Sequence, residues 1–143
     1  MSKALDHMVE VITYSEIGYK PVVDYNGWRV AVLNYHYELL PENITHFQKH
    51  NETIEVFLLV QGSCVLYIGE GKETITDIHG IQLQPGAVYS VKRGVWHSHT
   101  LSPDARVMIV ENTDTGEHNS PLCRLTAENR EKLRQIAADF AIS

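Results

Sequence analysis

Residues 50–62 read HNETIEVFLLVQG, and this segment decides the fold. Residues 56–60 are all apolar, which is typical of a strand that is buried on both faces. Glu55 opens this strand and lies on the same side as Phe57 and Leu59. A carboxylate facing a core must be paired, hydrogen-bonded or bound to a metal, because desolvating it alone costs several kcal/mol. The alternative is that Glu55 lies in water at the open end of the strand.

Outward from this segment, the chain consists of short β-like runs separated by turns. The runs are rich in Val, Ile, Leu and aromatic residues, as strands are, and they cover residues 9–14, 28–37, 54–60, 64–69, 82–83, 88–92 and 106–111. Gly, Pro and Asn residues separate them. Several short strands with turns this closely spaced predict an all-β sandwich or barrel.

One helix is expected, at about residues 127–141. Thr126 is a good N-cap residue, and apolar side chains recur with helical spacing at Leu133, Ile136, Ala137 and Phe140. We expect this helix to pack across the outside of the β domain.

Length and charge narrow the classes of protein to which this chain can belong. The chain has 143 residues, which suits one domain, and its net charge is −6. Its largest basic cluster is Lys92-Arg93, so we expect no nucleic-acid partner. It has neither an apolar run long enough to span a membrane nor a signal-like start, so we expect a cytoplasmic protein that does not bind membranes. Cys64 and Cys123 are then expected to be reduced.

Two short stretches concentrate potential metal ligands. His46, Gln48 and His50 project to one side if their stretch is extended, and His97 and His99 do so in a second stretch. Imidazole nitrogens and a carboxylate that converge inside a barrel suit Zn, Ni, Fe or Mn. Spacing alone does not bring them together; a fold must do so.

The spacing resembles the cupin superfamily. In the first cupin motif a second histidine is followed by a glutamate and, after six more residues, by a glycine, and His50, Glu55 and Gly62 match these positions. In the second motif, Gly86, Gly94 and His97 match by offset. The two motifs occur in the cupin order, and the resemblance covers about residues 28–112.

This resemblance implies a double-stranded β-helix, the cupin jelly-roll barrel. The chain resembles small single-domain bacterial cupins, which implies one domain over residues 1–143, a barrel core at about 28–112 and a homodimer. The segment Gly94-Val95-Trp96-His97 is also similar to the ureidoglycolate lyase branch, but four residues do not transfer an activity.

The resemblance also implies a metal site, with one departure. Metal-binding cupins use two histidines and a glutamate from the first motif and a histidine from the second, which correspond to Gln48, His50, Glu55 and His97. Gln48 is a weak ligand for a transition metal. The site therefore holds a metal with three strong ligands plus Gln48 or water, or His46 substitutes, or the site is a polar pocket without metal.

Further pocket candidates are His46, His99, Trp96 and Tyr35. Each has a structural alternative: His46 as a loop residue, His99 in a polar cluster at the barrel mouth, and the two aromatic residues in packing. For function, we expect a barrel that binds a small polar metabolite, with a divalent metal that supports isomerase, lyase or dioxygenase chemistry. The alternative is a non-catalytic binding or sensing module with a metal-free site.

Overall fold

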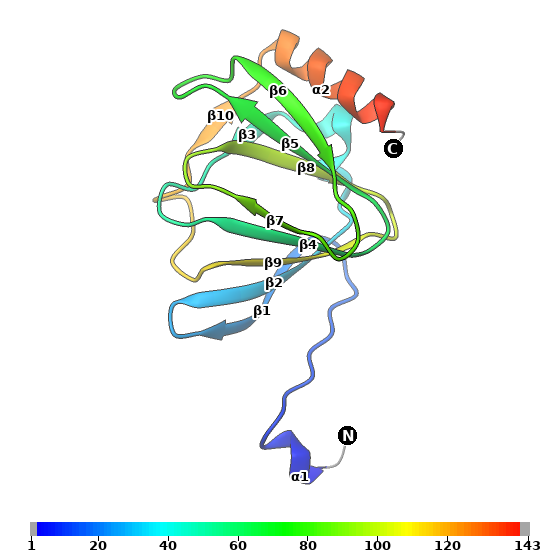
Figure 1. Ribbon diagram of the computed structural model, residues 1–143, viewed down its shortest axis with the longest axis vertical. Coiled ribbons are helices and arrows are strands. Elements are labelled where there is room, and N and C mark those ends of the chain that lie inside the picture. Colours follow the sequence, from blue (N-terminus) through cyan, green and yellow to red (C-terminus); the bar gives the residue numbers. More distant parts are fainter. Residues whose placement is uncertain (1–2, 141–143) are drawn as a thin grey trace.

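The computed structural model describes residues 3–140, which fold mainly into strands (Figure 1). The elements in chain order are α1 (Lys3–Asp6), β1 (Tyr19–Tyr25), β2 (Trp28–Asn34), η1 (Tyr37–Leu39), η2 (Pro41–Asn43), β3 (His46–Gln48), β4 (Glu55–Gln61), β5 (Cys64–Glu70), β6 (Asp77–Gln82), β7 (Val88–Val91), β8 (Trp96–Leu101), β9 (Arg106–Asn112), β10 (Leu122–Arg124) and α2 (Ala127–Asp139).

Two antiparallel five-stranded sheets face each other. One has the strand order β1-β2-β9-β4-β7 and the other the order β10-β3-β8-β5-β6. The chain passes back and forth between them, so that strands far apart in sequence, such as β2 and β9, are neighbours. This arrangement is a jelly roll and confirms the predicted all-β barrel with one C-terminal helix.

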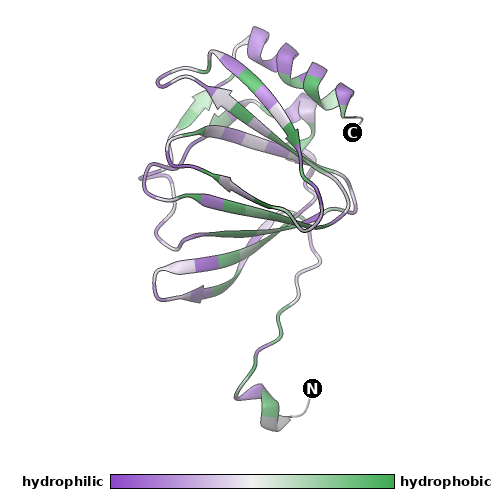
Figure 2. Ribbon diagram, viewed as in Figure 1, coloured by the Kyte–Doolittle hydropathy of each residue, from purple (hydrophilic) through white to green (hydrophobic). Residues whose placement is uncertain are grey.

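The hydrophobic core is divided between two layers. Phe57, Leu59 and Ile109 belong to the layer between the sheets, and all are almost completely buried. A second layer, which includes Tyr67 and Leu133, lies between the outer face of the β5-containing sheet and α2. The strands are the most hydrophobic part of the chain (Figure 2). Burial of apolar surface in both layers therefore holds the helix and the two sheets together.

Helix α2 packs on the outside of the barrel, against β6. The Thr126 side chain accepts a hydrogen bond from the Asn129 backbone N–H, and the Thr126 backbone N–H donates one to Asn129 Oδ1, so this start is a capping box. Gly80 lets the helix approach, since a Cβ there would lie 2.2 Å from Ile136 Cγ2. Among the residues described, no helix combines the length and the apolar character needed to cross a membrane.

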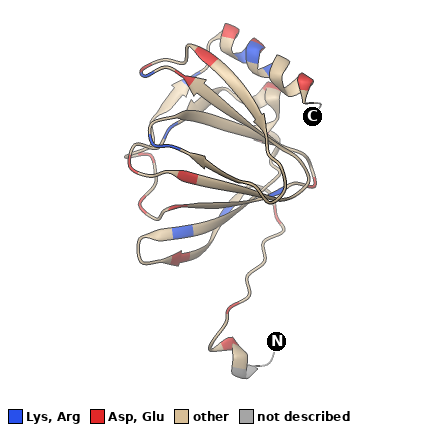
Figure 3. Cartoon of the chain, in the orientation of Figure 1, with Lys and Arg blue, Asp and Glu red and all other residues tan. Residues whose placement is uncertain are grey.

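The N-terminal part differs from the sequence-based expectation. Residues 9–14, predicted to be a strand, are extended but pair with no neighbour in the structure. The edge strands β1 and β10 were not predicted, because β1 contains Lys20, Pro21 and Asp24 and β10 has only three residues. Charged residues lie mainly on α2 and in the loops, and few lie on β4, β7 and β9 (Figure 3).

Candidate metal and ligand site

A cavity of about 410 Å³ opens between the two sheets. Strands of both sheets and the loop that contains Ser120 supply its walls. Leu33 and Ile109 line part of it, and ionisable side chains line most of the rest. A cavity of this size and mixed character suits a small polar molecule.

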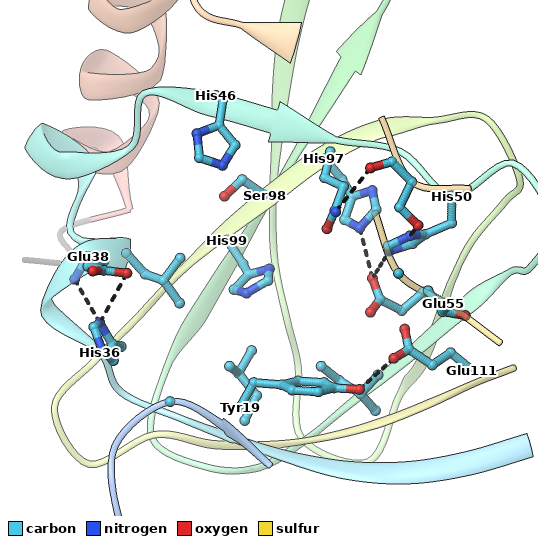
Figure 4. Close-up of a pocket in the computed structure, with 18 of the residues that line it drawn as sticks. Tyr19, His36, Glu38, His46, His50, Glu55, His97, Ser98, His99 and Glu111 are labelled. Atoms are coloured by element: carbon cyan, nitrogen blue, oxygen red, sulfur yellow. Dashed lines mark hydrogen bonds and ion pairs between the residues drawn. The ribbon is translucent and has the colours of Figure 1, made fainter. Parts of the chain in front are cut away.

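Three buried side chains meet in this cavity (Figure 4). His50 follows β3, Glu55 is the first residue of β4, and His97 lies in β8. Their potential ligand atoms all lie within 4.8 Å of one another. The Oε1 atom of Glu55 is 2.8 Å from His97 Nε2 and 3.3 Å from His50 Nε2. The fold thus brings together the three residues whose convergence the sequence could not show.

The Nδ1 atom of each imidazole, which faces away from Glu55, already makes a hydrogen bond. His97 Nδ1 lies 2.9 Å from the Val95 carbonyl oxygen, which can only accept a hydrogen bond, so Nδ1 carries the proton. His50 Nδ1 lies 2.7 Å from Ser120 Oγ, which donates its own proton to Asn119 Oδ1. In its neutral form, each ring therefore directs the lone pair of Nε2 toward the Glu55 carboxylate.

Three lone pairs that face one another need a cation between them. A proton on His97 Nε2 or a metal ion can fill this role. Burial alone would raise the pKa of Glu55, but hydrogen bonds from His50 and His97 outweigh it and hold this pKa well below its usual value. Burial alone would lower the pKa of His97, but its hydrogen bond to Glu55 and the negative charge raise it.

A second carboxylate, Glu111 on β9, lies beside the first. Its Oε2 atom accepts hydrogen bonds from Tyr19 Oη at 2.5 Å and from the Arg29 guanidinium at 2.6 and 3.0 Å. Burial and the neighbouring Glu55 raise the pKa of Glu111. Burial and the Glu111 carboxylate likewise raise the pKa of Tyr19.

Sequence reasoning did not select Glu111 or Tyr19. Glu111 shares one side of β9 with Val107 and Ile109, and an acid on an apolar strand face is the same signal that identified Glu55. Tyr19 offered no such signal, because it lies on the edge strand β1, most of whose side chains are exposed.

Of the other residues that the sequence suggested for the pocket, three line the cavity and two lie outside it. His46, Gln48 and His99 line the cavity. Trp96 does not: it points into the core beneath α2, where its Nε1 donates to the Lys72 carbonyl oxygen. Tyr35 also lies outside this cavity, beside a smaller one near the chain's N-terminal segment. We therefore no longer assign either aromatic residue to the pocket.

His99 differs from the other cavity histidines in its hydrogen bonding. Its Nδ1 atom is buried and has no hydrogen-bond partner among the described residues. Burial lowers the pKa of His99 to about 4, so the ring is neutral near pH 7. A buried ring nitrogen without a partner costs free energy, which a bound ligand can recover.

Comparison with known proteins identifies the fold. No protein-family model and no curated protein matches the sequence. A cupin-2 domain containing protein from Shewanella frigidimarina matches with a TM-score of 0.50 and 20% identity, over 69% of this chain and 84% of that one. A Streptomyces Pac13 variant with uridine matches with a TM-score of 0.55 and 10% identity, over 80% of this chain and 85% of that one.

A third match is L-ribose isomerase from Cellulomonas parahominis, with a TM-score of 0.51 and 12% identity, over 76% of this chain and 61% of that one. Likeness at these identities establishes the fold. The protein is a small jelly-roll barrel of the cupin type. It has the cupin fold that the two sequence motifs implied.

Proposed function

We propose that this protein is a metal-dependent enzyme whose ion is held by His50, Glu55 and His97. The observation that supports it is that lone pairs of all three side chains converge on one point, while the Nδ1 atom of each histidine already makes a hydrogen bond elsewhere. Two ligands at about 2.1 Å from one ion and at right angles lie about 3 Å apart. The contacts of 2.8 and 3.3 Å from Glu55 to the two rings therefore suit coordination with little rearrangement.

The donor set suits a divalent transition metal. Two imidazole nitrogens and one carboxylate oxygen favour Zn, Ni, Fe or Mn, and leave positions for substrate or water. When bound, such an ion polarises a carbonyl or hydroxyl oxygen of the substrate. Gln48 Nε2 donates to the Ser120 carbonyl oxygen, and the Gln48 side chain lines the same cavity beside the three ligands.

The remaining cavity residues favour proton transfer on a sugar-like substrate. The Tyr19 hydroxyl and the Glu111 carboxylate share a proton in a hydrogen bond on one wall, and neutral His99 offers an unpaired nitrogen. Isomerase and lyase reactions proceed by moving protons between carbon and oxygen, which such groups perform. Among proteins with this fold, Pac13 is named a nucleoside dehydratase and another is a ribose isomerase. Of the three reaction classes, we favour these two over dioxygenation.

The second candidate is a binding module without metal or turnover. It is favoured by the pair of His97 and Glu55, because a proton shared between these two side chains satisfies the same lone pairs as a metal ion. In this case the cavity binds a small polar metabolite through His99 and Tyr19 alone.

Metal binding separates the two candidates. After purification, metal content is measured by elemental analysis, and the melting temperature of chelator-treated protein is followed as Mn, Fe, Ni or Zn is added. The proposal expects stabilisation in the wild type and its loss in His97→Gln. The matched control is His79→Gln, which alters an exposed Glu70, Asp77 and His79 cluster with similarly close ligand atoms.

The binding module is favoured if the wild type holds less than about a tenth of an equivalent of metal and no ion stabilises it. If metal binds, the purified holoprotein is incubated with aldoses, ketoses, nucleosides and hydroxy acids, and products are followed by NMR. We also propose a cytoplasmic location and a homodimer, as the resemblance to small cupins implies.

A further inference from the structure

The loop of residues 113–121 joins β9 to β10 and supplies part of the cavity wall. We call it the β9–β10 loop. Its last residues run beside the segment that carries His50. The backbone N–H groups of Lys49 and Asn51 donate to carbonyl oxygens of this loop at 3.2 and 3.0 Å. These two hydrogen bonds flank His50 and therefore fix its ring against the loop.

A chain of hydrogen bonds leads from the His50 ring into this loop. His50 Nδ1 lies 2.7 Å from Ser120 Oγ, and Ser120 Oγ donates to Asn119 Oδ1 at 3.2 Å. A serine hydroxyl has one proton to donate. Since Asn119 receives that proton, Ser120 Oγ can only accept from His50, and the proton of the neutral ring lies on Nδ1.

The orientation of the Asn119 amide is fixed by its other partners. Its Nδ2 atom donates to Glu52 Oε2 at 2.8 Å and to the Asp114 carbonyl oxygen at 2.7 Å, and both of these atoms only accept. Asn119 Oδ1, which also accepts from the Gly116 backbone N–H at 3.0 Å, is therefore the atom that faces Ser120. Asn119 is 8% and Ser120 2% exposed, so water competes little for these bonds.

The position of this proton matters because His50 has two neutral tautomers. A proton on Nε2 would point toward Glu55 and occupy the place of a metal ion, whereas a proton on Nδ1 leaves the Nε2 lone pair free (Figure 4). The contact of 2.7 Å on the Nδ1 side is much shorter than the 3.3 Å from Nε2 to Glu55. In His97 the same choice is made by the Val95 backbone carbonyl oxygen, which only accepts. Among the two, His50 alone depends on side chains.

We propose that Asn119 and Ser120 are positioning residues that hold His50 in the tautomer with the proton on Nδ1 and with Nε2 available to a metal ion. A serine hydroxyl alone can donate to a ring nitrogen or accept from one, so it fits either tautomer. The acceptor oxygen of Asn119 removes this ambiguity. The consequence for metal affinity rests on the proposed function, but the tautomer itself does not.

The tautomer is tested first, in chelator-treated, ¹⁵N-labelled protein at pH 8. Long-range ¹H–¹⁵N spectra distinguish a protonated from a bare ring nitrogen, and the His50 signals are those lost in His50→Gln. In the wild type we expect a protonated Nδ1 and a bare Nε2. In Asn119→Ala the Ser120 hydroxyl loses its acceptor and turns to donate to His50, so the proton should move to Nε2. Ser120→Ala, which removes the acceptor of Nδ1–H, should shift the ring in the same direction.

Asn119→Asp separates the two roles that Asn119 plays. This variant keeps an oxygen that accepts from Ser120, but it loses both donors that hold the loop to Glu52 and Asp114. We expect the wild-type tautomer in Asn119→Asp, although its melting temperature falls.

Metal affinity is tested next, by calorimetric titration of chelator-treated protein with whichever of Mn, Fe, Ni or Zn stabilises the wild type most. Loss of a side chain that orients a metal ligand typically weakens metal binding about 10–100-fold, and we expect this of Asn119→Ala and Ser120→Ala. Asn119→Asp should keep the wild-type affinity. The matched control is Ser102→Ala, because the Ser102 hydroxyl also has two partners, the Ser63 N–H and Asp104, but lies outside the cavity. It should change neither the His50 spectrum nor the affinity.

Three results overturn the proposal. The first is a wild-type His50 with its proton on Nε2. The second is an unchanged tautomer in both Asn119→Ala and Ser120→Ala, with circular dichroism spectra like that of the wild type. The third is a tautomer in Asn119→Asp that shifts as it does in Asn119→Ala, which assigns the effect to the loop. A wild type that binds no metal, but shows the expected tautomers in every variant, supports the positioning role and contradicts the proposed function instead.

Discussion

Replacing Glu55 with Gln preserves the shape of the side chain and removes its charge. In metal-free protein, His97 then loses the carboxylate that lies 2.8 Å from its Nε2 atom. Because both side chains are buried, solvent screens this pair far less than a surface pair. Removing one partner of a buried pair costs about 3–5 kcal/mol when the other charge remains uncompensated. His97 recovers part of this by releasing its proton, so we expect a loss of about 3 kcal/mol near pH 5.5.

The loss should depend on pH in a defined direction. The pKa of Glu55 is lowered, so its contribution is present above about pH 4.3 and disappears as pH falls through the lowered value. The pKa of His97 is raised, so its contribution is present below about pH 6.5 and disappears as pH rises through the raised value. Both contributions are complete between about pH 4.3 and 6.5. As pH rises through the raised pKa of His97, the loss should shrink toward about 1 kcal/mol, the value of an ordinary hydrogen bond.

The assay is thermal unfolding of wild type and Glu55→Gln in chelator at pH 5.5 and 8. At about 2–4 °C per kcal/mol, the variant should melt about 6–12 °C lower at pH 5.5, and the difference from wild type should be smaller at pH 8. Added metal should act with the opposite pH dependence, because it competes with protons for the histidines and binds weakly below about pH 6. At 100 times its dissociation constant it should stabilise the wild type by about 2.7 kcal/mol and the variant by far less.

The control for this experiment is Glu70→Gln. Glu70 lies 2.7 Å from His79 Nε2, a contact as short as that of the buried pair, but both side chains are exposed. Exposed pairs contribute about 0–1 kcal/mol, so this variant should melt within a few degrees of the wild type at both pH values. A loss for Glu55→Gln that is larger at pH 8 than at pH 5.5 would refute the charged pair. Unchanged stabilisation of that variant by metal would refute the ligand role of Glu55.

Three further predictions concern the fold. Gly62→Ala should lower the free energy of unfolding in urea by more than about 2 kcal/mol, since φ is +73° and the new Cβ would lie 2.5 Å from the Ala105 backbone. The control is Gly86→Ala, where φ is +83° but no atom lies near the new Cβ, and the loss should be only about 1–2 kcal/mol. Native protein at pH 8 should react with one equivalent of a thiol reagent, at Cys123, because burial raises the pKa of Cys64 to about 12; two fast equivalents would contradict this. Leu133→Ala should cost about 2–5 kcal/mol, and a loss below about 1 kcal/mol would show that α2 is not essential to the second core layer.

Local patterns predicted the all-β architecture, whereas the cupin barrel and the residues that converge in it were implied by the resemblance to the two cupin motifs. Strand alternation gives the side on which Glu55 lies, and the motif offsets pair it with His97. The same alternation excludes Trp96 from the cavity, since adjacent strand residues point to opposite faces and His97 points inward. Trp96 is next to His97 in the chain, but its side chain lies in the core beneath α2.

Other features could not be predicted because they depend on tertiary pairing. The contact of Tyr19 with Glu111 joins residues 92 positions apart. The predicted strand at residues 9–14 is absent because a strand needs a partner, and one copy of the chain supplies none.

Under the proposed function, the charges in the cavity favour metal-assisted chemistry over passive binding. Glu38, which also lines the cavity, is largely exposed to water. Among the other charged lining residues, Arg29 neutralises Glu111 through two hydrogen bonds to one oxygen, so Glu55 supplies the remaining charge of −1 when the histidines are neutral. One added proton brings this to zero, and a divalent ion brings it to +1. A cavity at +1, partly shielded from water, stabilises a substrate oxygen that develops negative charge during reaction. A cavity at zero provides no such stabilisation, so the ion, and not the shape of the barrel, decides between enzyme and binding module.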